Sequence, residues 1–185
     1  MIFRSGQPKM VFDIDEISEE GLDFKVQESK NAFEIDQPEC ALCQDVTVAG
    51  RLEKVLGDIY FSGQINTELS LMCSRCLEPF NFPVATQVTA HFVSRGKAHK
   101  ESPEIELHPS DIDIEYYDEN VIDLIPTVHD QILLTVPLVS LCKPTCRGLC
   151  PQCGKNWNLG DCSCHKEPTV DPRLEVLKSL KNKIK

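Results

Sequence analysis

The stretch that decides the fold reads Ile59-Tyr-Phe-Ser-Gly-Gln-Ile-Asn-Thr-Glu-Leu-Ser-Leu71, then Cys73-Ser-Arg-Cys76, then Phe80 to Val93. The first segment has the composition of a β-strand, and Gly63 within it predicts a β-bulge. In the last segment every second residue from Val84 to Phe92 falls on one face, as in a strand. The two cysteines lie between these strands, so we expect a hairpin with a metal-binding knuckle at its tip.

Three further strands are predicted on the N-terminal side of this hairpin. Met10–Ile14 and Leu22–Val26 alternate in polarity, and Val46–Leu56 ends at a Gly-Asp turn. Consecutive strands with short turns predict an antiparallel meander, either an open sheet or a small barrel. The expected fold class is therefore mostly β (α+β), with two short helices and a C-terminal zinc-binding module.

The segment after the hairpin changes character twice. Residues 97–120 are dense in Asp and Glu, and like charges at this density predict a loose acidic loop. A helix is then predicted over residues 123–135, because Asp123 can cap it and Pro126 suits its first turn. Pro137 ends it.

A second helix is predicted near the C-terminus, where Asp171-Pro172 precedes an apolar stripe of Leu174, Leu177 and Leu180. Residues 1–140 form the predicted β-rich body, with a net charge of −15, and residues 141–185 form a tail of +5. Such a basic tail favours contact with a polyanion, although a solvated charged tail has the same composition.

The ten cysteines point to metal binding. We find no run of 18 apolar residues and no apolar stretch of a signal peptide at the N-terminus, so we expect no membrane contact and a cytoplasmic protein. A reducing cytosol disfavours disulfides, and three C-x2-C pairs have the spacing of zinc knuckles. Zinc is therefore the expected cofactor.

Six cysteines in the tail are candidate zinc ligands. Cys150-Pro-Gln-Cys153-Gly is the clearest half-site, and the simplest second half is Cys162 with Cys164. Cys142 and Cys146 could replace that second pair or help to bind another ion. His165 could also serve, although a histidine beside a site is more often a bystander.

A second metal site is predicted from spacing alone. Cys40 and Cys43 could join Cys73 and Cys76 as a four-cysteine set, and the alternative is that they are reduced thiols in loops. Phosphate-binding, hydrolase and metalloprotease motifs are absent from the sequence. We therefore expect a protein that is not an enzyme, with no catalytic residues and no small-molecule substrate.

Several separated motifs resemble one known family. They are Cys73-Ser-Arg-Cys76-Leu-Glu-Pro-Phe80, Asp123-Leu-Ile-Pro, Cys142-x3-Cys146-Arg-Gly-Leu-Cys150-Pro-x-Cys153-Gly and Asp171-Pro-Arg-Leu. In this order they resemble the YceD family, the large ribosomal RNA subunit accumulation proteins. The resemblance implies a cytoplasmic bacterial protein, with plastid relatives, that is needed for normal accumulation of large-subunit ribosomal RNA. Some family members lack the terminal cysteines, so zinc there is not the whole family function.

Two modes of action follow from these features. In the first, a ribosome-biogenesis factor contacts large-subunit RNA through basic residues of the tail, for which the candidates are Arg147, Lys155, Lys178, Lys181 and Lys183. In the alternative, a zinc-stabilised adaptor binds a basic ribosomal protein through its acidic body, without touching RNA. Trp157 could stack on a base, or it could cover the metal knuckle, which we favour.

Overall fold

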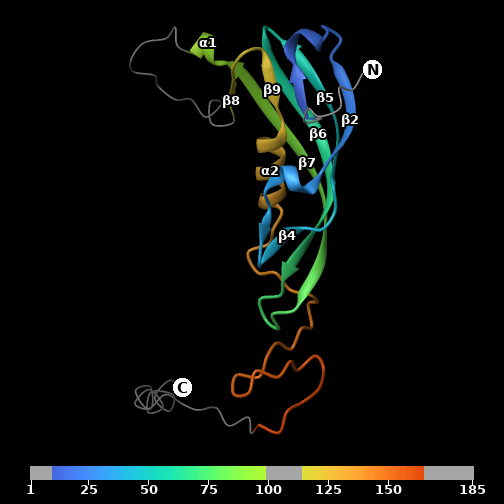
Figure 1. The fold of residues 1–185 in the computed structure, drawn as a ribbon, viewed down its shortest axis with the longest axis vertical. Coiled ribbons are helices and arrows are strands. Elements are labelled where there is room, and N and C mark those ends of the chain that lie inside the picture. Colours follow the sequence, from blue (N-terminus) through green and yellow to red (C-terminus); the bar gives the residue numbers. More distant parts are fainter. Residues whose placement is uncertain (1–9, 99–113, 165–185) are drawn as a thin grey trace, which may run out of the picture.

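The computed structural model describes residues 10–98 and 114–164. This part of the chain is mostly β-structure, with one helix longer than a single turn (Figure 1). In chain order the elements are β1 (Val11–Asp13), η1 (Ile14–Glu16), β2 (Leu22–Glu28), η2 (Lys30–Phe33), β3 (Asp36–Gln37), β4 (Cys40–Leu42), β5 (Val46–Val55), β6 (Asp58–Met72), β7 (Pro79–Ser94), α1 (Arg95–Ala98), β8 (Ile114–Tyr117), β9 (Val121–Asp123) and α2 (Ile125–Leu134).

The β6–β7 hairpin is the longest feature of the sheet. Its antiparallel register runs without interruption from Ile59 opposite Phe92 to Met72 opposite Pro79. The bulge predicted at Gly63 is not found, because Gly63 stays in register with Gly50. A Cβ atom on Gly63 would lie 2.9 Å from ring carbons of Phe61. The glycine therefore makes room for an aromatic ring on the sheet and does not distort the strand.

The main sheet is open, so the small barrel considered from the sequence is wrong. β2 pairs with β5 at one end of the order, and β8 pairs with β7 in parallel at the other. Among the described residues β1 pairs only with β9, in a separate two-stranded sheet. A barrel needs its first and last strands to meet, and here they do not.

Two expectations concern the segments around the acidic stretch and the C-terminus. Residues 97–120 were expected to form a loop, yet Ile114–Tyr117 form strand β8 along β7, and residues 99–113 lie outside the described part of the chain. The second helix, predicted from Asp171, lies outside it as well.

Helix α2 covers one face of the sheet. Its Val128 and Ile132 are fully buried, and the Gln131 side-chain amide donates to the Thr86 hydroxyl at 3.3 Å. The Asp123 carboxylate accepts from the Ile125 amide at 2.9 Å, while Pro126 occupies the first turn. Pro126 thus lies in the first turn as predicted, whereas the predicted N-cap is wrong, because Leu124 occupies that position without a side-chain capping bond and Asp123 lies one residue before it. No helix of the described residues is long and apolar enough to cross a membrane.

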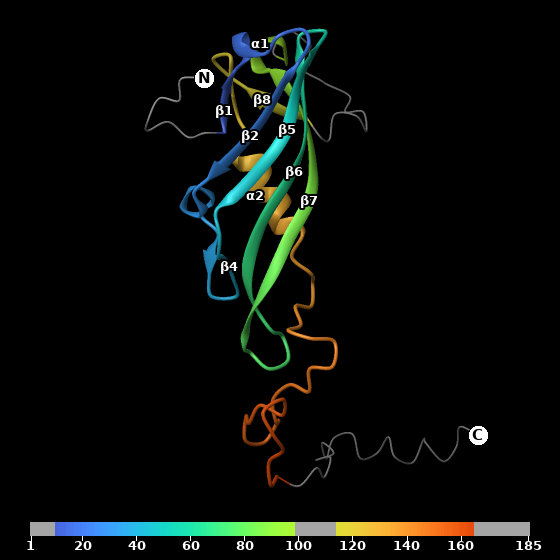
Figure 2. The ribbon, with the colours of Figure 1, turned by 90° about the vertical axis from the view of Figure 1, so that its right-hand side faces the viewer.

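The direction of α2 decides where the tail begins. The β7 strand runs away from the hairpin tip, which comprises residues 73–78, and α2 brings the chain back along the sheet toward that tip (Figure 2). The segment after α2 reaches the tip, and the described part of the tail, residues 141–164, lies beyond it. The tip and the tail are therefore neighbours in space although the three strands β7, β8 and β9 and the helices α1 and α2 separate them in sequence.

Candidate metal centres

The hairpin tip is a tight knuckle. The Leu77 amide donates to the Cys73 carbonyl at 2.9 Å, and the Cys73 amide donates to the Glu78 carbonyl at 3.0 Å. Leu77 has a φ of +58°, a left-handed conformation that lets the chain reverse. Both cysteines of the tip are buried, at 0% exposure for Cys73 and 3% for Cys76.

The tail is hydrogen-bonded to this tip. The Ser74 amide donates to the Ser140 carbonyl at 2.8 Å, and the Leu149 amide donates to the Arg75 carbonyl at 3.1 Å. The Arg75 guanidinium donates to the Cys146 carbonyl at 3.0 Å. These bonds align the first turn of the tail with the tip.

This alignment brings four thiols together, which we call the tip cluster: Cys73, Cys76, Cys142 and Cys146. Their sulfur atoms all lie within 4.8 Å of one another. The Cys73–Cys146 and Cys76–Cys142 sulfur pairs are both 3.8 Å apart. A tetrahedral zinc ion with Zn–S bonds of about 2.3 Å would place its sulfurs about 3.8 Å apart. The cluster could hold a metal ion with little rearrangement.

A second set of four thiols lies entirely within the tail, and we call it the tail cluster: Cys150, Cys153, Cys162 and Cys164. These sulfurs also lie within 4.8 Å of one another. The Gly154 amide donates to the Cys150 carbonyl at 2.9 Å, and Gly154 has a φ of +72°. That conformation suits glycine and closes the knuckle after its second cysteine.

Hydrogen-bond donors adjust the acidity of the tip cluster. Burial raises the pKa of the Cys73 thiol, but backbone N–H groups led by that of Cys142 outweigh it and lower the pKa to about 6. Burial raises the pKa of Cys142 to about 12. Thiols this close cannot all ionise unaided because their charges repel. A cation would allow the remaining protons to leave.

The tail cluster shows the same division. The Trp157 indole N–H donates to the Cys162 sulfur at 3.3 Å and lowers the pKa of that thiol to about 6. A hydrogen bond with Cys153, followed by burial, raises the pKa of Cys164 to about 12. In each cluster, therefore, the pKa of at least one thiol is lowered and that of another is raised to about 12, so a bound cation would be needed to ionise all four.

Asn158, from the tail segment between Cys153 and Cys162, contacts the tip cluster. Its side-chain amide donates to the Cys146 sulfur at 3.2 Å and lowers the pKa of that thiol, and its carbonyl oxygen accepts from the Arg147 amide at 3.0 Å. The neighbouring Trp157 donates instead to the Cys162 sulfur of the tail cluster. Trp157, which we considered for base stacking or for covering the knuckle, thus donates to a sulfur of the tail cluster, and the adjacent Asn158 donates to a sulfur of the tip cluster.

The candidate RNA-binding residues divide into two groups. Arg147 forms an ion pair with Asp161, and the Lys155 ammonium donates to the Asp161 carbonyl at 2.6 Å. Both cations thus brace the tail internally. Lys178, Lys181 and Lys183 lie outside the described residues, as does His165.

Cys40 and Cys43 are not brought to Cys73 and Cys76. Cys40 begins strand β4 and lies opposite Leu71, while the Cys43 amide donates to the Glu68 carbonyl at 2.8 Å. Residues three apart along extended backbone are about 10 Å apart and point to opposite faces. The C-x2-C spacing therefore does not make a knuckle here, because this segment is extended.

The tip cluster as a set was missed in the sequence analysis. Cys142 and Cys146 were grouped with the other tail cysteines because they are close in sequence, although their cluster partners lie 66 and 73 positions away. One signal was available: six cysteines exceed one ion's need by two, and a lone C-x2-C pair at the hairpin tip lacks two ligands. Assigning the two extra tail cysteines to the incomplete pair at the hairpin tip yields the tip cluster.

Replacing Trp157 with Phe tests the donor to the tail cluster. The ring is retained and the N–H is lost, so we expect metal affinity at this cluster to fall about 10–100-fold, as for other lost outer-shell partners. Competition with a coloured chelator measures it. The control is Tyr60→Phe on the distant sheet, and an unchanged affinity in the Trp157→Phe protein would contradict this role.

These features define a class: an open β-sheet protein whose hairpin tip and tail carry two four-cysteine clusters, each able to hold a metal ion. A family model described as "Large ribosomal RNA subunit accumulation protein YceD" matches residues 61–181. The chain belongs to this YceD family. The matched region contains all but the first three residues of the hairpin, together with α2 and both clusters.

Three relatives illustrate the similarity. The uncharacterised protein YlbN of Bacillus subtilis is 30% identical over 136 residues, 73% of each chain. The large ribosomal RNA subunit accumulation protein YceD of Haemophilus influenzae is 31% identical over 83 residues, 45% of each chain. The chloroplastic YCED homolog 1 of Zea mays is 28% identical over 145 residues, 67% of this chain and 49% of the maize protein. The chain thus spans about half the length of the two relatives named for RNA accumulation, and no solved structure matches it.

Proposed function

We propose that the protein is a non-enzymatic ribosome-biogenesis factor that promotes the accumulation of large-subunit ribosomal RNA. The observation that carries this proposal is the family match over residues 61–181. Two relatives carry that activity in their names. The ribosome-related role follows from the family, and the mode of action is our inference.

Zinc is the metal we propose for the tail cluster. Four thiolates in a tetrahedral arrangement select zinc or an iron–sulfur centre among common metals, and a C-x2-C knuckle such as Cys150–Cys153 is typical of structural zinc. Reduced thiols in this number fit a reducing compartment, so we propose a cytoplasmic location. With four protein ligands the ion has no open position for a substrate, and this supports a structural role.

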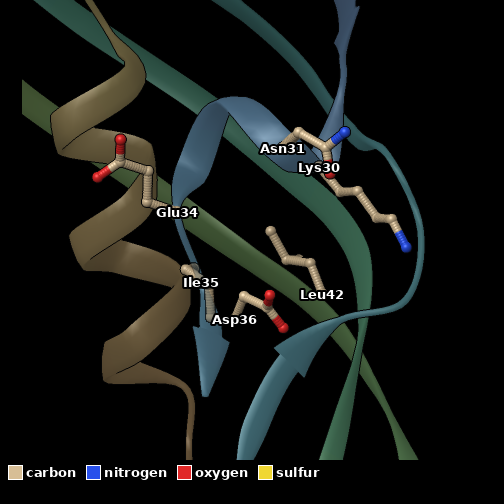
Figure 3. A pocket seen from close by; sticks show the side chains of 6 residues that line it. All are labelled: Lys30, Asn31, Glu34, Ile35, Asp36 and Leu42. Atoms are coloured by element: carbon tan, nitrogen blue, oxygen red, sulfur yellow. The ribbon is translucent and has the colours of Figure 1, made fainter.

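A cavity elsewhere on the sheet does not suggest catalysis. Its volume is about 320 Å³, and residues of η2, β3 and β4 line it. Lys30 and Glu34 extend from it in opposite directions (Figure 3). Catalytic sites bring polar groups to one point, so this arrangement supports the non-enzymatic reading.

The charge of the described residues favours the adaptor as the second candidate mode. They contain 21 Asp and Glu against 10 Lys and Arg. Each zinc with four thiolates would add two more negative charges. Since Arg147 and Lys155 are held on Asp161, direct RNA contact falls to the lysines beyond residue 164. A basic ribosomal protein is the partner that suits the acidic sheet.

The test is RNA binding at several salt concentrations. If Lys178, Lys181 and Lys183 each neutralise a phosphate, their replacement by Glu should remove about two to three units from the slope of log affinity against log salt. The matched control replaces Lys25 of β2, Lys30 of η2 and Lys54 of β5 with Glu. Large-subunit RNA fragments are the probe, and the zinc content of every variant is measured.

Two results would decide between the modes. RNA recognition by the tail would be wrong if both triple variants bind RNA with equal affinity. It would also be wrong if the affinity of the wild type does not depend on salt concentration. Salt-sensitive binding of purified basic ribosomal proteins to the wild type would then support the adaptor. If neither RNA nor these proteins bind, both modes are wrong.

A further inference from the structure

We infer that the tip cluster is a second structural zinc site, and that its ion acts as a clasp fastening the tail to the β6–β7 hairpin. The ligands are Cys73 and Cys76 from the hairpin tip together with Cys142 and Cys146 from the tail. This inference is independent of the proposed function, because it rests on the geometry and burial of the four thiols.

The first step is that the folded sheet prepares half of the site. The tip backbone is fixed by its own hydrogen bonds at Cys73 and Leu77. The β6–β7 register holds the knuckle up to the Met72–Pro79 pair. Two sulfurs are thus placed on a rigid element before any metal arrives, which lowers the cost of ordering the ligands.

The second step is that the tail supplies the other half in matching geometry. Sulfur–sulfur distances of 3.8 Å link Cys73 to Cys146 and Cys76 to Cys142, each pair joining tip and tail. These distances equal the edge of a zinc tetrathiolate tetrahedron, about 3.8 Å. The ion would therefore cross-link the two segments with two ligands from each.

The third step is that burial and charge suit a closed site. Cys73, Cys76 and Cys146 are at most 3% exposed, whereas Cys153 of the tail cluster is exposed. Binding follows Zn²⁺ + 4 RSH → [Zn(SR)4]²⁻ + 4 H⁺, so the site acquires two negative charges. The Asn158 amide donates to one sulfur, and the Arg75 guanidinium lies against the Cys146 carbonyl. Both groups offset that charge.

The fourth step separates the roles of the clusters. The tail cluster draws its ligands from residues 150–164, so its metal can organise the tail locally. The tip cluster joins residues 66 and 73 positions apart. Its metal can bind with four ligands only when the hairpin and α2 have brought tip and tail together. The clasp thus links the folding of the tail to that of the sheet.

Zinc content of full-length variants tests the clasp. We expect two zinc ions per chain in the wild type, one after Cys142→Ser with Cys146→Ser, and one after Cys162→Ser with Cys164→Ser. The control Cys40→Ser with Cys43→Ser should retain two. One zinc in the wild type, or two in the Cys142/Cys146 variant, would overturn the inference.

Hydrogen exchange on the same proteins tests the fastening itself. The Ser74 and Leu149 amides bond across the tip–tail junction, so they should lose protection in the Cys142/Cys146 variant. The Ser74 amide should keep more of its protection in the Cys162/Cys164 variant than in the Cys142/Cys146 variant. Equal protection of the Ser74 amide in the wild type and the Cys142/Cys146 variant would exclude a clasp even if a metal binds.

A wild-type measurement covers the case in which a variant does not fold. Metal-stripped protein, kept under argon without reductant, should present ten free thiols and then take up two equivalents of Co²⁺ with thiolate-to-cobalt absorption from both. A count of six free thiols would indicate two disulfides, and uptake of one equivalent of Co²⁺ would indicate a single metal site. Either result would contradict the clasp. If the wild type binds two zinc ions but cells that lack the protein accumulate normal amounts of large-subunit ribosomal RNA, the proposed function is wrong and the clasp still stands.

Discussion

Chelation of zinc from the intact protein is expected to unfold residues 142–164 while the main sheet stays folded. The tail has almost no core of its own, because its residues with buried side chains are Cys146 and Cys150. With zinc bound, we expect metal ligation to supply most of its stability, since ligation contributes about 10–16 kcal/mol in zinc-finger peptides. The sheet, in contrast, contains fully buried residues such as Leu52 and Ile65.

Hydrogen exchange before and after chelation measures this directly. Amides of the tail, including the Cys150 and Gly154 amides that form the knuckle, should exchange as in an unfolded chain. The Val48 and Ile65 amides in the sheet should keep their protection, and re-addition of zinc should restore the tail. Uniform loss of protection across the sheet would mean that the metal sites stabilise the whole protein.

Replacing Phe61 with Ala is expected to lower the free energy of unfolding by about 3–5 kcal/mol, the usual cost of removing a buried aromatic ring. The ring is 2% exposed and stacks on Phe24 with centroids 5.8 Å apart. It also covers Gly50 and Gly63, which have no side chains of their own. Its loss would leave a cavity that the two glycines cannot fill.

The matched control is Tyr60→Ala, one residue earlier on the opposite face of the same strand. Tyr60 is 41% exposed and stacks on His91, so we expect a cost of about 1 kcal/mol. Urea denaturation of the sheet at saturating zinc measures both variants. A difference below about 1 kcal/mol between them would show that the Phe61 face is not the core of the sheet.

The structure suggests how the hairpin contributes to the proposed role. Strands β6 and β7 form one continuous hairpin that ends at the tip with Cys73 and Cys76 (Figure 2). A clasped tail would be held in a fixed direction at the end of that hairpin. Partners recognised by the tail and by the acidic sheet would then be held at a set separation.

Several features of this protein follow from the sequence alone. Period-two alternation marks the strands that became β1, β2 and β7, because side chains of a strand alternate between core and solvent. The Asp123 and Pro126 signals place the start of α2 within two residues of its observed position. The tail knuckle at Cys150 and Cys153 is equally local, since its ligands and its Gly154 turn lie within five residues. Such features depend on neighbours in the chain.

Tertiary structure alone decided the partners of the other cysteines. A C-x2-C pair provides two ligands and carries no information about where the remaining two lie. Cys40 and Cys43 have the spacing of a knuckle, but β4 pairing with β6 keeps their segment extended. Cys142 and Cys146 reach the hairpin tip because α2 packs against β7 and returns the chain to it. The physical reason is that a four-ligand site between distant segments is assembled by sheet order and helix direction, which sequence spacing does not encode.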